Sequence, residues 1–139
     1  MFVRLPYFTL LRNFIAYHRI RIIAVDETWL SKSVDSNSIN IPNYLLFRSD
    51  RIGSCGGGVA LYIDDLLPCS PILALLGQTS LSMSWVLYFR CEHIAIICIY
   101  RPLCSPIADL HHLESCMYFI AVDGSLRTIS AILVVSLLP

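Results

Sequence analysis

The chain has 139 residues, with ten basic and ten acidic side chains and a formal net charge of zero. That length allows one small domain, and the absence of a basic arm excludes a strong electrostatic grip on nucleic acid. Hydrophobic residues make up 56% and charged residues 14%, against about 45–50% and about 25% in typical soluble domains. The chain is therefore either membrane-associated or part of a larger buried α/β core.

Apolar runs in the chain are shorter than the roughly 20 residues that a membrane-spanning helix needs. The longest, His93–Tyr100 and Ile129–Leu138, have the length of strands. The amino terminus begins apolar, but Pro6 and Arg12 interrupt it and no small-residue cleavage site follows. We therefore expect no transmembrane helix, no secretory signal, and an intracellular location in the cytoplasm or nucleus.

The first half of the chain predicts a helix and then three strands. Apolar residues recur at helical spacing over about Pro6–His18. Arg21–Glu27 is an apolar run ending in carboxylates, as a buried strand does at the edge of a sheet. A polar loop, Ser31–Asn40, precedes antiparallel strands at Tyr44–Phe47 and Val59–Ile63, which a glycine-rich turn joins.

The second half predicts a loop, a hairpin, a helix and a last strand. Prolines mark the loop over Pro68–Pro71. The hairpin pairs Trp85–Phe89 with His93–Tyr100, and the helix covers Ile107–Phe119. Ile129–Leu137 is the final strand. This order fits an α/β or α+β fold with a mixed sheet.

Six cysteines stand at positions 55, 69, 91, 98, 104 and 116, without a CxxC pair. Irregular spacing favours free thiols, and Cys91 and Cys98, inside apolar runs, are expected to be buried and reduced. A zinc site can be drawn from Cys91, Cys104, His111 and Cys116. Its spacing matches no zinc knuckle or ribbon, so we expect none.

Three local patterns stand out in order along the chain. Ile22–Leu30 reads IIAVDETWL, Phe47–Arg51 reads FRSDR with GGGVALY following at Gly56–Tyr62, and Ile99–Pro102 reads IYRP. Together they resemble the endonuclease/exonuclease/phosphatase family, and more closely the endonucleases of non-LTR retrotransposons. The resemblance covers about residues 8–104, whereas residues 105–139 diverge, and the chain is expected to form one partial domain over residues 1–139.

The resemblance implies a partial four-layer α-β-β-α sandwich that cuts DNA phosphodiester bonds with a divalent metal, usually magnesium. Glu27 matches the glutamate that holds the metal, and Tyr100 matches the tyrosine that positions the scissile phosphate. Magnesium takes oxygen ligands, often only one or two carboxylates, and offsets charge that develops on a phosphoryl group. We expect Glu27 and Tyr100 to end neighbouring strands and to face one loop edge.

The chain also departs from the family pattern. Asp26 stands where the family has a small or neutral residue, and adjacent strand residues point to opposite faces, so Asp26 should not join Glu27 at a metal. The family's early asparagine has no counterpart before the first helix. No Gly-Asp-Phe-Asn motif follows Ile132–Val135, and Asp123-Gly124 is a poor substitute. The late aspartate and the aspartate–histidine pair would lie beyond Pro139.

Three histidines, His93, His111 and His112, are the other candidate bases, and their contexts favour surface or core-edge positions. Since catalysis needs several groups held in register, we expect a truncated domain that is inactive and binds magnesium weakly or not at all. Uncovered apolar faces and open strand edges predict self-association. The alternative is a small apolar interaction or membrane-associated polypeptide without enzymatic activity.

Overall fold

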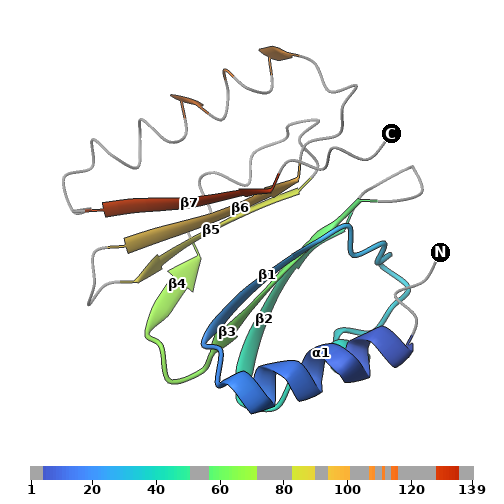
Figure 1. Ribbon diagram of the computed structural model, residues 1–139. Helices are drawn as coiled ribbons and strands as arrows, with labels where there is room; N and C mark the ends of the chain where they lie inside the picture. Colours follow the sequence, from blue (N-terminus) through green and yellow to red (C-terminus); the bar gives the residue numbers. More distant parts are fainter. Residues whose placement is uncertain are drawn as a thin grey trace.

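The computed structural model describes residues 5–50, 57–71, 83–89, 94–100, 107–108, 111, 114–115 and 128–134 (Figure 1). It shows an α+β protein in which the helix α1 packs on one sheet and a second sheet packs on the other side of the first (Figure 1). None of the helices within these ranges is long and apolar enough to cross a membrane.

The helix α1 (Leu5–His18) confirms the predicted amphipathic helix. Pro6 lies in its first turn. Proline is tolerated there because N–H groups of the first turn have no hydrogen-bond acceptor within the helix. The helix ends at His18, and Arg19 directly after it has a left-handed φ of 51°, the conformation in which many helices terminate. Phe8 and Ile15 are buried beneath the helix, with Leu11 packed beside them.

The first sheet has the order β1-β3-β2, with both pairs antiparallel. Its strands are β1 (Ile22–Asp26), β2 (Tyr44–Ser49) and β3 (Val59–Asp64), so the three strands predicted in the first half are confirmed. The expected loop between β1 and β2 contains a short 3-10 helix, η1 (Ser36–Ile39). The Asp35 side chain caps it by accepting a hydrogen bond from the Asn37 N–H at 3.1 Å.

The second sheet has the order β4-β5-β6-β7 and is mixed, because β6 and β7 are parallel and the other pairs antiparallel. The hairpin of β5 (Met83–Phe89) and β6 (Ile94–Tyr100) and the last strand β7 (Thr128–Val134) were predicted. The loop expected over Pro68–Pro71 was wrong in part, since β4 (Cys69–Pro71) pairs with β5. An edge strand tolerates Pro71, which has no N–H to offer a ladder.

The helix expected over Ile107–Phe119 is described only in part. Ile107, Ala108, His111, Glu114 and Ser115 are helical and exposed. The remaining residues of the predicted helix lie outside the described ranges.

The central strand β3 is buried on both faces because it lies between α1 and the second sheet. Leu61 and Ile63 pack against Ile96 of β6 in the core between the sheets. Ala60 and Tyr62 point the other way, into the core under α1. Alternating side chains of a strand face opposite sides of its sheet, so one apolar run supplies both cores.

The Tyr62 hydroxyl donates a 2.9 Å hydrogen bond to the Ile39 carbonyl in the core under α1. This bond ties the loop that carries η1 to the underside of the first sheet. Burial raises the pKa of Tyr62 to about 12, against the opposing effect of the positive Arg48. Burial also raises the pKa of the Cys98 thiol to about 11, and the negative charge of Asp26 adds to the rise.

Truncating Leu61, which is completely buried, should open a cavity between the sheets. We expect Leu61→Ala to lower the free energy of unfolding by about 2–5 kcal/mol. Leu66→Ala is the matched control, because Leu66 is 79% exposed and its change should stay within about 0.5 kcal/mol. Urea unfolding followed by circular dichroism measures both variants, and equal effects would contradict the assignment of Leu61 to the core.

Alkaline pH should destabilise the fold through Cys98 and Tyr62. Unfolding restores the Cys98 pKa from about 11 to its ordinary 9.0 and the Tyr62 pKa from about 12 to 10.0. The folded chain then holds protons that the unfolded chain has released, so stability is full below these ordinary values and falls as pH rises toward the folded ones. Urea unfolding at a series of pH values measures the decrease in the free energy of unfolding. Cys98→Ala should remove the part of this decrease that begins at the lower pH, because the Cys98 thiol has the lower pKa values.

Candidate functional site

A strained turn follows β1 and faces the glycines that precede β3. Glu27 and Trp29 have left-handed backbones, with φ of 49° and 54°. Opposite them, Gly57 and Gly58 have φ of 80° and 97°. Left-handed residues other than glycine are uncommon, and those that persist are held in place by their surroundings.

Three hydrogen bonds hold this turn to the glycines. The Thr28 N–H donates to the Gly58 carbonyl at 3.2 Å, and the Trp29 N–H donates to the Gly57 carbonyl at 2.8 Å. In return, the Gly57 N–H donates to Glu27 Oε2 at 2.8 Å. The ETWL and GGGVALY patterns, about 30 residues apart, therefore form one unit that orients the Glu27 carboxylate.

Gly58 is required at its position by close contact as well as by its backbone angle. A Cβ atom built on Gly58 would lie 2.3 Å from Thr28 Oγ1, far inside van der Waals contact. The positive φ would add strain for any other residue. The close contact and the backbone angle explain why this position is a glycine. The sequence alone indicated only a flexible turn here.

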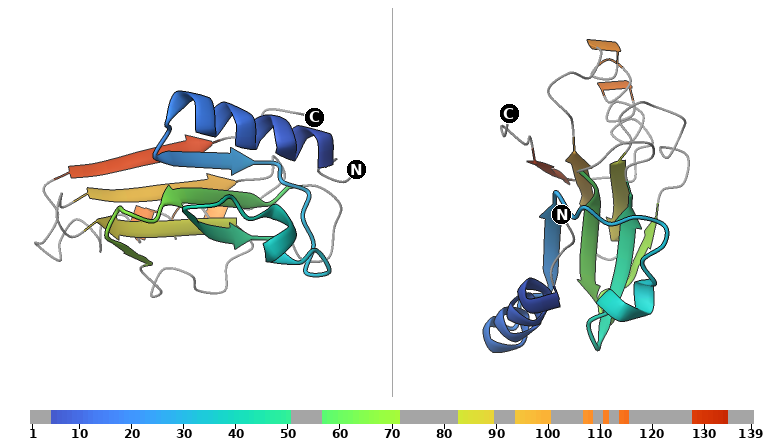
Figure 2. Two further views of the ribbon diagram at one scale, coloured as in Figure 1. Left: turned by 90° about the horizontal axis from the view of Figure 1, so that it is seen from below. Right: turned by 90° about the vertical axis from the view of Figure 1, so that its right-hand side faces the viewer.

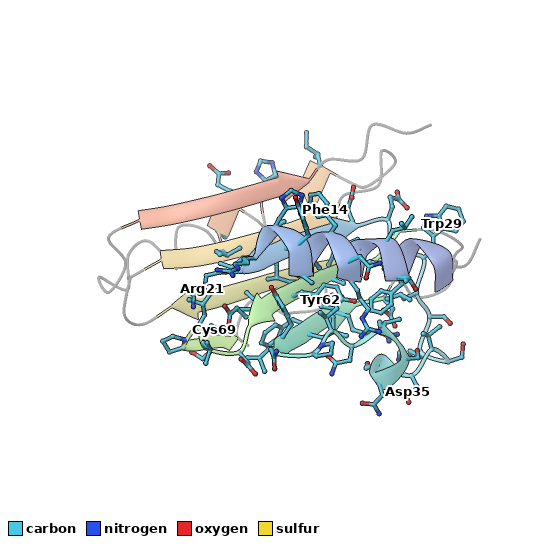
Figure 3. The ribbon with its side chains drawn as sticks, turned by 60° about the horizontal axis from the view of Figure 1, so that its bottom comes forward. Phe14, Arg21, Trp29, Asp35, Tyr62 and Cys69 are labelled. Carbon is cyan, nitrogen blue, oxygen red and sulfur yellow. The ribbon has the colours of Figure 1, made fainter. Side chains whose placement is uncertain are left out.

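The Thr28 side chain is almost completely buried, at 2% exposure. Its hydroxyl has no hydrogen-bond partner within the part of the chain that the structure describes. A buried hydroxyl without a partner is destabilising, since it has given up its bonds to water. The next residue, Trp29, is 43% exposed and lies at the end of the molecule, clear of the ribbon (Figure 3).

Arg48 of β2 fastens the loop that follows this turn. Its guanidinium donates to the carbonyls of Ser31 and Val34, each at 2.8 Å, and to the Ser36 hydroxyl at 3.3 Å. It also forms a two-pronged ion pair with Asp50. Sequence reasoning used FRSDR only as a pattern and missed this role of Arg48. A cation followed two residues later by an acid on a half-buried strand was the available signal.

The ion pair of Arg48 and Asp50 is shielded from water, with side-chain exposures of 12% and 11%. Two parallel hydrogen bonds between a guanidinium and a carboxylate need the flat shape of arginine. Loss of either partner would leave a charge shielded and unpaired, which is strongly destabilising. The loop after Glu27 is therefore held at one end by the glycines and at the other by Arg48.

Tyr100 is the last residue of β6, and Glu27 directly follows β1. The two strands are not neighbours within a sheet, because they belong to different sheets. They contact each other across the stack, and both run toward the same end of the molecule (Figure 2). Glu27 and the backbone of Tyr100 thus lie at one end of the two sheets.

Asp26 shares the face of β1 that carries Ile22 and Ala24, which pack in the core between the sheets. Its charge helps to raise the pKa of Cys98 on the opposing sheet. The Glu27 carboxylate instead meets Gly57. The structure thus places the two adjacent acids in different surroundings.

Among the residues that the structure describes, no group of three or more His, Cys, Asp or Glu side chains is placed so that it could hold a metal ion. His111 is exposed, with Nδ1 3.8 Å from Glu114 Oε2. His93, His112, Asp123 and four cysteines, Cys55, Cys91, Cys104 and Cys116, lie outside the described ranges. Glu27 offers one oriented carboxylate of the hard-oxygen type that suits magnesium.

A surface groove of about 540 Å³ runs between α1 and the turn before β2. Arg12, Asn13, Ile41 and Tyr44 are among the residues that line it. None of its lining residues belongs to the turn at Glu27. The oriented carboxylate therefore lies apart from this groove.

Comparison with known proteins does not assign a family to the chain. No protein-family model matches it, and no curated protein matches it.

The Thr28 hydroxyl, which has no hydrogen-bond partner among the described residues, predicts an unusual outcome for Thr28→Val. Valine has nearly the same shape and removes this buried polar group, so we expect unchanged stability or a gain of about 1 kcal/mol. Gly58→Ala is the contrasting variant and should lose about 2 kcal/mol or more through strain and the contact with Thr28. Thermal unfolding compares them. A clear loss in Thr28→Val would mean that the hydroxyl has a partner.

Proposed function

We propose that this chain is a domain of the endonuclease/exonuclease/phosphatase type, related to the DNA-nicking endonucleases of non-LTR retrotransposons. We further propose that the 139 residues do not cleave DNA by themselves. In the proposed four-layer sandwich, α1 and the two stacked sheets are three of the layers.

The observation that carries the proposal is the contact between Glu27 and Gly57, at 2.8 Å. Two patterns that resemble the family separately in the sequence meet there, and the result is an oriented carboxylate rather than a mobile one. The strand that ends with the third pattern, β6, runs to the same end of the molecule (Figure 2). Geometry of this kind is what a reacting site requires of its acidic group.

Glu27 is the residue that would hold magnesium. When bound there, the metal would polarise a phosphoryl oxygen and offset the charge that develops on it. The Gly57 N–H keeps one Glu27 oxygen in place, so the carboxylate loses little freedom when it binds a cation. With Glu27 and Tyr100 as the matched positions, the chain lacks a matched group that activates water, and weak metal binding without hydrolysis follows.

We expect the chain to leave supercoiled plasmid DNA intact in magnesium or manganese. We also expect weak Mn²⁺ binding that Glu27→Gln reduces about fivefold or more, because one carboxylate supplies the charge at the site. Electron paramagnetic resonance of free Mn²⁺ measures the binding. Glu114→Gln is the matched control, since Glu114 is exposed and away from this turn. Metal-dependent nicking that Glu27→Gln abolishes would contradict the absence of activity.

A second candidate is an interaction polypeptide without enzymatic activity, and the outer face of α1 favours it. Leu10, Phe14 and Tyr17 lie on exposed helix positions at spacings of four and three. The His18 ring contacts both neighbours, tilted against Phe14 with centroids 4.4 Å apart and edge-on to Tyr17 with centroids 4.9 Å apart. Contiguous apolar side chains on a surface mark a site of association.

This surface predicts self-association of the isolated chain. We call the exposed side chains of Leu10, Phe14 and Tyr17 the apolar stripe of α1. We expect Phe14→Glu to shift the protein toward the monomer in size-exclusion chromatography with light scattering, because burying a charge at the middle of this stripe is unfavourable. Asn13→Glu is the matched control, adding the same charge at an exposed position of the same helix. A wild-type chain that is monomeric across the accessible concentrations would rule out association through this stripe.

A further inference from the structure

Trp29 is the residue whose placement neither packing nor the proposed metal site explains. It is 43% exposed, and it does not join the buried clusters among the residues that the structure describes. Tryptophan has the largest apolar side chain, so leaving it in water forgoes much of the stabilisation that burial would provide. Its ring is available to a ligand.

The backbone around Trp29 is held in the shape that presents the ring. Left-handed residues flank Thr28 on both sides. Each such conformation costs about 1–3 kcal/mol, so it persists only where the surrounding structure enforces it. The Trp29 N–H is fixed to the Gly57 carbonyl at 2.8 Å. The buried Thr28 side chain anchors the middle of the turn beside Gly58. The ring therefore projects from a rigid base rather than from a mobile loop.

Polar groups that suit a phosphate backbone follow Trp29 along the chain. Lys32 lies exposed on the turn in which the Val34 N–H bonds to the Ser31 carbonyl at 3.0 Å. The exposed hydroxyls of Ser31 and Ser33 on the same turn are hydrogen-bonded to each other at 2.7 Å, which leaves one O–H of the pair to donate to a ligand. A flat aromatic ring followed within a few residues by a cation and a hydroxyl donor suits single-stranded nucleic acid, with the ring stacking on a base.

We propose that Trp29 is a stacking platform for an unpaired base of single-stranded nucleic acid. The inference rests on the proposed function, since it gives the Glu27 turn a strand to engage. Glu27 and Asp26 carry negative charge at the same end of β1, so a divalent cation must offset their repulsion of phosphate. With Lys32 as the exposed cation on this turn, the affinity depends more on stacking than on charge.

The test compares two fluorescein-labelled oligonucleotides of equal length, one of thymidines and one of abasic sites, by fluorescence anisotropy in Mg²⁺. Both carry the same phosphates, and only the first has bases to stack. Wild type should bind the thymidine strand about tenfold more tightly than the abasic strand. Trp29→Leu should lose that preference and bind the abasic strand as wild type does. Trp29→Phe keeps a ring and should retain most of the preference.

Equal weakening of both oligonucleotides in Trp29→Leu would overturn the proposal, because it would show a structural role. So would equal wild-type affinity for the two strands, absence of binding to either, or Trp29-dependent binding of an apolar peptide in their place. Glu27→Gln separates this proposal from the proposed function. If binding of the Glu27→Gln variant depends on Mg²⁺ as wild-type binding does, the metal site at Glu27 is refuted. If that variant still prefers the thymidine strand, the role of Trp29 is supported independently of the metal site.

Discussion

Burial of β3 on both faces is the constraint on which the rest of the structure depends. Val59 and Leu61 face the second sheet while Ala60 and Tyr62 face α1, so a helix and a sheet must cover the strand from opposite sides. Water is excluded from both sides, and every backbone group of β3 needs a partner. The strands β1 and β2 supply those partners on its two edges.

The glycines that lead into β3 carry this constraint to the candidate site. The strand fixes Gly57 and Gly58 against the end of β1, and their carbonyls then bind the N–H groups of Trp29 and Thr28. The turn has to adopt left-handed angles in order to meet them. Orientation of the Glu27 carboxylate and exposure of the Trp29 ring are two consequences of the same contact. The stability of the fold and the geometry of the candidate site are therefore coupled at this point.

The linear pattern predicted α1 and, within the described part of the chain, all the strands but one, because apolar periodicity reports directly on which side of an element is covered. It missed β4, where Pro71 argues for a loop and only the neighbouring β5 makes a strand possible. It also missed the contacts of Arg48, since hydrogen bonds to Ser31 and Val34 depend on where the loop returns. Local sequence patterns carry no information about such contacts between residues that are far apart in the chain.

The sequence by itself determined α1, six of the described strands, their apolar character and the position of Glu27 at the end of one of them. These features depend on residue type and spacing within a few residues. Only the tertiary structure decided that β1 and β6 belong to different sheets, that Gly57 holds Glu27, and that Trp29 is left exposed. The reason is physical: these outcomes depend on which distant segments exclude water from one another, and burial of that kind belongs to the folded chain as a whole.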